Sequence, residues 1–237
     1  MSIQSKASVP EPQQAQLIRT LALIAAIWGL SDIGYYFALP ALGVQPGYGA
    51  NPVAIALYYG LWVIIAVITF RHLYRGWSPF ENRQAAVILP STAFAGFALF
   101  AIYALPLLPP VNWGQPGAPP DLLVATAWYF LPKSIEILFQ QLLMVAMVLA
   151  FAAQRCRVRS MALCAALLFG GMHLLLAFSE VPWAYVVRFT LAASLFGFAV
   201  PYLILRVKNG FAYSYATHWG YYALTVVMVH TISPYAV

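Results

Sequence analysis

Charged residues and cysteines are scarce in this sequence. Asp, Glu, Lys and Arg make up 8% of its 237 residues, whereas hydrophobic residues make up 63%. A soluble domain keeps its surface in water with about 25% charged residues, so the composition excludes an ordinary soluble protein. The two cysteines, Cys156 and Cys164, have no metal-ligand spacing, and we interpret them as apolar filler.

Long apolar runs take the place of charge. Because lipid offers the backbone no hydrogen-bond partners, a chain this apolar must cross as helices or as a closed barrel, and unbroken runs of about 20 residues favour helices. We therefore predict an all-α fold, a polytopic transmembrane helix bundle of about seven spans. The expected spans are 20–42, 51–70, 84–105, 121–154, 160–178, 182–206 and 211–232.

The fourth of these runs is too long for one crossing. We predict that Pro132 ends a short outer segment and that the membrane helix runs from about 133 to 154, because proline interrupts a helix interior. The whole chain then divides into a polar tail (1–18), three N-terminal transmembrane helices (19–120) and a C-terminal helical core (121–237).

The basic residues lie mostly between the apolar runs. Seven crossings with the N-terminus inside place ten of them on one side: Lys6, Arg19, Arg71, Arg75, Arg83, Arg155, Arg157, Arg159, Arg206 and Lys208. The positive-inside rule then predicts an N-in, C-out topology. The net charge of +6 thus reflects topology, and no basic cluster with interleaved aromatics indicates nucleic acid. We expect an integral membrane protein, located in the cytoplasmic (inner) membrane if the protein is bacterial. The expected partners are the lipid bilayer and a membrane-embedded protein substrate or partner subunit.

Ionisable side chains inside spans are costly, so each is a candidate functional residue. Glu136 and Gln140 lie four residues apart and share one helical face. His173 and His218 come from two other spans, and we predict that they converge on a common polar pocket beside the fourth span. Asp32 is a second intramembrane carboxylate, without a sequence feature that directs it to the histidines.

Two motifs carry a resemblance to a known family. The segment FGGMH places Phe169 and His173 in the pattern FxxxH, and His218 follows in the last span. Over roughly residues 121–235 the sequence resembles the CAAX protease and bacteriocin-processing family of intramembrane endopeptidases, whose pattern is EExxxR, FxxxH and HxxxN. The resemblance implies that the first glutamate activates water and that the histidines and the asparagine hold an oxyanion or a metal ion.

The chain departs from this pattern at the acids. One register places Gln140 and Gln141 at the paired glutamates, and the other keeps Glu136 as the second acid with Ile135 as the first. Tyr222 stands at the asparagine in both. The resemblance therefore implies an altered or impaired catalytic set of Glu136, Gln140, His173 and His218, with Glu136 as a displaced base.

Three functional hypotheses remain. The first is an intramembrane endopeptidase with this altered site, and the second is a non-catalytic pseudoprotease that binds a membrane protein, lipid or pigment as an accessory subunit. A transporter or channel is the third, against which the absence of an inverted repeat counts. No cofactor is expected with certainty; a zinc ion needs about three protein ligands, and the sequence offers His173 and His218 as weak candidates.

Structural explanations compete with each functional one. Glu136 is expected to pair with Arg188 or with Lys133, because buried charges in membranes find partners. The two histidines are available for hydrogen bonds between helices. Gly170 and Gly171 are expected to allow close helix contact, as small residues do in membranes, and Gly60, Gly96 and Gly197 share this interpretation.

Overall fold

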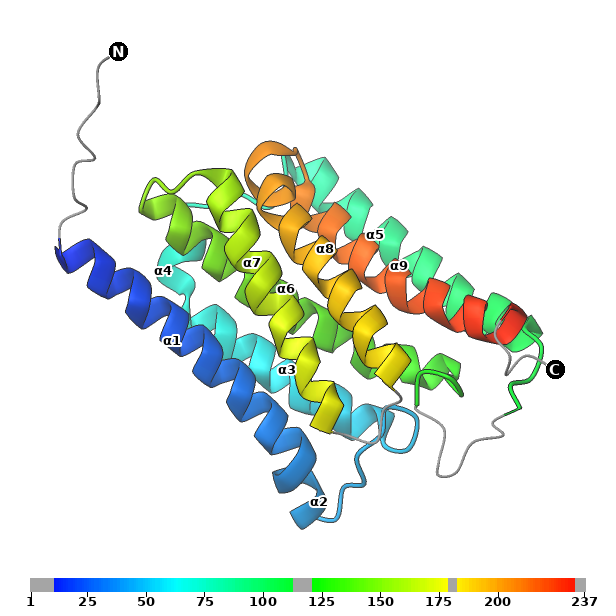
Figure 1. The fold of residues 1–237 in the computed structure, drawn as a ribbon. Coiled ribbons are helices and arrows are strands. Elements are labelled where there is room, and N and C mark those ends of the chain that lie inside the picture. Colours follow the sequence, from blue (N-terminus) through cyan, green and yellow to red (C-terminus); the bar gives the residue numbers. More distant parts are fainter. Residues whose placement is uncertain (1–10, 113–120, 179–182, 233–237) are drawn as a thin grey trace.

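A computed structural model of the protein describes residues 11–112, 121–178 and 183–232, in which long helices lie side by side (Figure 1). The long helices are α1 (Glu11–Ile33), α3 (Pro52–Thr69), α5 (Arg83–Leu99), α6 (Ala127–Ala153), α7 (Val158–His173), α8 (Trp183–Arg206) and α9 (Gly210–Thr231). Shorter helical pieces extend or join them: Gly34–Ala38, α2 (Leu39–Ala41), α4 (Arg71–Tyr74), Phe100–Ala104, Leu105–Leu107 and Leu174–Phe178. The predicted all-α bundle is confirmed.

Six helical segments of the described residues are long and apolar enough to cross a membrane. The protein is therefore an integral membrane protein, with one candidate span fewer than the seven predicted. The missing one is α9, which forms at the predicted place and packs against α5, α6 and α8 but is not among the six. Its first half is rich in tyrosine and includes Ser214 and His218, which lowers its hydropathy.

Two helix boundaries differ from the prediction. Helix α1 begins at Glu11, so residues 11–18 of the expected polar tail are helical, and residues 1–10 lie outside the described part. Pro12 is compatible with this start because the first turn lacks internal N–H partners. Pro132 does not separate two segments, since α6 runs through it from Ala127. A proline inside a helix removes one backbone hydrogen bond, but α6 continues through it.

Helix α6 is the central helix of the bundle. Two thirds of its span (67%) is buried, against 6% of the span that contains α5. One apolar cluster surrounds Phe139 and Leu143 with residues of α1, α3, α7 and α8. A second surrounds Ile137 with residues of the α5 extension and α9, including Trp219. Polar side chains of α6 are therefore held inside the protein, away from lipid.

The basic connections gather at one end of the bundle. The start of α1, the α4 region, the α6–α7 turn and the α8–α9 turn lie at the same end (Figure 1). There the Lys208 ammonium forms an exposed ion pair with Glu81, and the Glu81 N–H donates to Asn209 Oδ1 at 2.9 Å. This grouping agrees with the predicted charge partition, and the membrane face to which this end belongs stays a prediction.

Helices α7 and α8 approach each other closely. A Cβ atom at Gly170 would collide with Ser194, and one at Gly197 would lie 2.7 Å from the carbonyl oxygen of Ala165. The predicted close contact is confirmed at these two glycines. It is wrong for Gly60, Gly96 and Gly171, where an added Cβ would meet nothing within 4 Å.

Candidate functional site

The connection between α2 and α3 folds inward and brings Tyr48 to the core. Gly47 has a φ of +134°, a conformation that side chains disfavour, and its N–H donates to the Tyr35 hydroxyl at 3.0 Å. The Tyr48 N–H donates to Asp121 Oδ2 at 2.8 Å. Burial, followed by the nearby charge of Glu136, raises the pKa of Tyr48 well above its ordinary value. Its hydroxyl therefore stays a proton donor.

Glu136 is held by three partners. Its Oε2 atom lies 2.5 Å from Lys133 Nζ and accepts from the Tyr48 hydroxyl at 2.7 Å, while its Oε1 accepts from Gln140 Nε2 at 3.0 Å. Lys133 Nζ also lies 4.2 Å and 4.6 Å from the ring centroids of Tyr48 and Tyr222, within cation–π range. Both charges are buried, with exposed fractions of 6% and 9%.

The structure decides between the two expected partners of Glu136. Pairing with Lys133 is confirmed. Pairing with Arg188 is wrong, because Arg188 donates instead to the Thr225 hydroxyl at 2.9 Å. The side chains of Arg188 on α8 and Glu136 on α6 contact different neighbours. Counting residues along a helix estimates the depth of a side chain in the membrane but not the direction in which it points.

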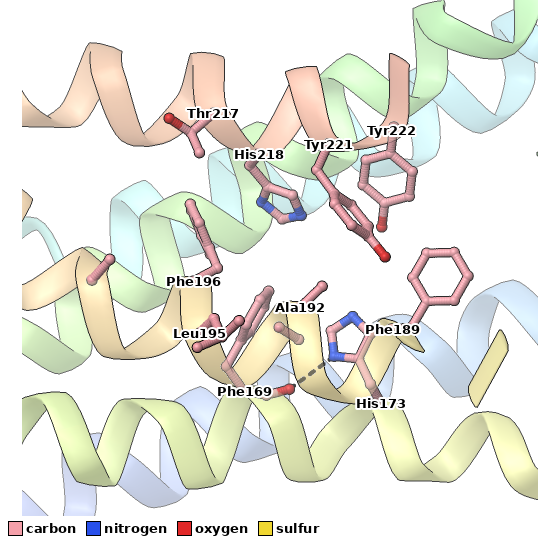
Figure 2. A pocket seen from close by; sticks show the side chains of 12 residues that line it. Phe169, His173, Phe189, Ala192, Leu195, Phe196, Thr217, His218, Tyr221 and Tyr222 are labelled. Atoms are coloured by element: carbon pink, nitrogen blue, oxygen red, sulfur yellow. Dashed lines mark hydrogen bonds between the residues drawn. The ribbon is translucent and has the colours of Figure 1, made fainter. Parts of the chain in front are cut away.

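A cavity of about 370 Å³ lies between α7, α8 and α9. Figure 2 shows His173 and His218 on opposite walls with their rings toward the same space, and Tyr221 and Tyr222 alongside. The lining residues are Phe169, His173, Phe189, Ala192, Ala193, Leu195, Phe196, Ala199, Thr217, His218, Tyr221 and Tyr222. The predicted convergence of the two imidazoles is confirmed. The expected polar character is wrong, since most of the wall is aliphatic or aromatic, and α6 supplies none of it.

Hydrogen bonds fix both imidazole rings. His173 Nδ1 lies 2.8 Å from the Phe169 carbonyl oxygen, one turn earlier, and therefore donates to it. His218 Nδ1 lies 3.1 Å from Gln141 Nε2 and accepts from that amide. The Phe169 ring centroid is 5.0 Å from the ring of His173 and 5.8 Å from that of His218. The pattern FxxxH thus places one aromatic ring against both histidines.

The neighbouring glutamines have different partners. Gln141 is fully buried and links His218 to Ser214, whose hydroxyl donates to Gln141 Oε1 at 2.8 Å. Gln140 donates to Glu136, and its Oε1 has no hydrogen-bond partner among the described residues. His173 and His218 line the cavity, whereas Glu136 and Gln140 are not among its lining residues.

Several residues of this region were not predicted as functional. Tyr48, Phe189 and Phe196 come from other parts of the chain, and no spacing connects them to the histidines. Tyr48 follows a glycine in a proline- and glycine-rich connection. This composition predicts a tight turn, but it does not predict that the Tyr48 side chain points inward. Tyr221 precedes Tyr222, and its helical position alone does not reveal that it lines the cavity.

The donor set does not fit a zinc ion. In the described residues no group of three His, Cys, Asp or Glu side chains could hold a metal. A metal ion in the cavity would have His173 and His218 as ligands, fewer than the about three that zinc sites use.

The cavity opens sideways, between α8 and α9. Its lining includes the exposed residues Leu195, Ala199 and Thr217, and Leu195 is the thirteenth of the 24 residues of α8. The middle of a membrane-spanning helix lies at the depth of the hydrocarbon core, whose thickness is about 30 Å. An opening at the exposed Leu195 would therefore face lipid when α8 spans the membrane.

Comparisons with protein-family models, curated proteins and solved structures found no match for this chain. The similarity to CAAX-processing endopeptidases rests on the sequence motifs alone.

Proposed function

We propose that this chain is a membrane-embedded protein of the CAAX-protease type that has kept a ligand cavity and lost its general base, so that it binds a membrane ligand or partner without cleaving it. The observation that carries this proposal is the environment of Glu136, whose two carboxylate oxygens are occupied by Lys133, Tyr48 and Gln140.

A general base must present a free lone pair to the water that it activates. Three of the about four lone-pair positions of the Glu136 carboxylate are taken by Lys133, Tyr48 and Gln140, and Glu136 is not among the residues that line the cavity. Gln140 and Gln141 stand where the first register expects acids, and an amide does not accept a proton near neutral pH. The loss of a general base removes about 10²–10⁴-fold of rate, which supports a binding role.

The cavity supports binding in its own right. Its volume of about 370 Å³ falls within the roughly 300–1,000 Å³ of small-molecule sites. Its apolar wall and lateral opening suit a molecule that arrives from the bilayer.

The test is a cleavage assay with purified protein in lipid nanodiscs and membrane-anchored reporter peptides. The proposal predicts no cleavage above that of the His173→Ala variant, which serves as the background control. It also predicts that the double variant Gln140→Glu, Gln141→Glu is the form most able to gain activity. Wild-type cleavage that disappears in both His173→Ala and Glu136→Gln would contradict the proposal.

One observation favours a second candidate, an endopeptidase with Glu136 as a displaced base. Gln140 Oε1 is buried without a partner in the described chain, and Gln140 also touches Glu136, so this amide is placed to orient a water molecule. In that case Gln140→Leu abolishes a measurable wild-type cleavage, whereas the non-catalytic protein is indifferent to the change.

A further inference from the structure

Polar groups face the cavity from two of its walls. In the described part of the chain, the buried Tyr221 hydroxyl makes no hydrogen bond of good geometry, although Tyr221 lines the cavity and Thr225 and Arg188 lie near its hydroxyl. His173 and His218 use their Nδ1 atoms for contacts within the protein, which leaves the Nε2 atom of each ring without a described partner.

The hydrogen bonds at each Nδ1 indicate what each ring offers. His173 donates from Nδ1 to the Phe169 carbonyl, so its Nε2 carries a lone pair and is an acceptor. Gln141 turns its Nε2 to His218 Nδ1 and its Oε1 to the Ser214 hydroxyl; in this orientation His218 accepts at Nδ1, and its Nε2 carries the proton and is a donor. With the Tyr221 O–H, these three groups present two donors and one acceptor, beside the hydroxyls of Thr217 and Tyr222 in the same lining.

A hydroxyl group complements this set, because it has one proton to donate and two lone pairs to accept with. No Asp, Glu, Lys or Arg belongs to the described lining. Arg188 lies over the Tyr221 ring but outside the lining, and it donates to Thr225, so a charged head group would lose its hydration without a counter-charge in the cavity wall. We propose that the cavity binds a neutral lipid alcohol from the bilayer, with its hydroxyl bound by His173, His218 and Tyr221 and its hydrocarbon against Phe169, Phe189 and Leu195.

This inference names the ligand for the proposed binding function and rests on it. It does not depend on whether the chain also cleaves peptides, since the polar groups are present in either case. Polar groups left unpaired inside a membrane protein are costly, and one hydroxyl group has the proton and the two lone pairs that these three groups require.

The test is photolabelling of the full-length protein in nanodiscs with hexadecanol that carries a diazirine, followed by mass spectrometry of the labelled peptides. We expect label on the peptides of α8 and α9 that line the cavity. Unlabelled hexadecanol should displace the probe at a concentration about tenfold lower than hexadecyl methyl ether, which lacks the donated proton. Competition by a diacylglycerol and by a sterol then identifies which class of lipid alcohol fits.

Matched variants separate the polar site from general lipid contact. Tyr221→Phe removes a hydroxyl that makes no described hydrogen bond of good geometry, so the fold is expected to persist while hexadecanol binds about tenfold more weakly. Leu195→Trp narrows the opening and should prevent labelling, whereas Leu191→Trp, on the exposed surface one turn away, should not.

Equal displacement by hexadecanol and its methyl ether, or labelling unchanged in both Tyr221→Phe and His173→Phe, would overturn the inference and leave water as the partner of these groups. The proposed function fails separately, through wild-type cleavage in the peptide assay.

Discussion

Replacing Lys133 with methionine tests the arrangement around Glu136 most sharply. Lys133 and Glu136 are both buried, and Lys133 provides the positive charge that is paired with the carboxylate. Methionine has a similar length and no charge, so the variant leaves the packing largely intact. The carboxylate then keeps Tyr48 and Gln140 as partners and loses its counter-ion.

The expected cost follows from burial. Removal of one member of a buried ion pair destabilises a protein by about 3–5 kcal/mol, because an uncompensated charge remains inside. Glu136→Gln should cost a similar amount, since it leaves the Lys133 ammonium among tyrosine rings. The double variant Lys133→Met, Glu136→Gln leaves neither charge, and its loss should be smaller than the sum of the two single losses by at least about 2 kcal/mol.

The assay is reversible unfolding in mixed micelles, with the free energy of unfolding measured for wild type, both single variants and the double variant. The exposed pair of Lys208 and Glu81 is the control, and its removal should leave stability unchanged within error because solvent screens it. The reasoning would be refuted if the double variant lost as much free energy of unfolding as the two single variants together. It would also be refuted if each single variant lost less than about 1 kcal/mol.

Two further predictions concern the neighbouring loop and the α7–α8 contact. Tyr48→Phe removes a hydrogen bond to a carboxylate and should cost about 1.5–3 kcal/mol. Because the pKa of Tyr48 in the folded protein lies well above its ordinary value of 10.0, its contribution to stability is complete below pH 10.0 and declines as the pH rises above it. The free energy of unfolding, measured from pH 8 to 11, should therefore fall less steeply with pH in Tyr48→Phe than in wild type. Equal slopes in the two proteins would contradict this. Gly197→Ala should cost about 1–3 kcal/mol of stability, because the added Cβ meets the backbone of Ala165. Gly171→Ala has no such neighbour and should be neutral or stabilising by up to about 1 kcal/mol. Thermal unfolding of the two variants tests this difference.

Hydropathy predicted the helices well because it depends on local composition. The observed α3 (Pro52–Thr69) and α8 (Trp183–Arg206) lie within one residue of the expected spans. The same signal is weaker at α9, where polar and aromatic side chains lower the average hydropathy, so α9 is not among the six candidate spans of the described residues. The division of the chain into a tail, three helices and a core stays a prediction.

The site was predicted in part for a related reason. The motif spacing selected His173 and His218, and both line one cavity. Helical periodicity also predicted that Glu136 meets a residue three or four positions away, as Lys133 and Gln140 show. The contact of Tyr48 with Glu136 spans 88 positions and depends on how one connection folds, which no local pattern contains. Catalytic roles for these residues stay predictions.

The central claim is that Glu136 is a paired carboxylate, and carbodiimide labelling tests it directly. Carbodiimides modify carboxyl groups that are free of an ion pair and spare carboxylates that are held in one. Mass spectrometry of protein treated in nanodiscs should find Glu136 unmodified in wild type and modified in Lys133→Met. Modification of Glu136 in wild type at the rate seen in Lys133→Met would contradict the account.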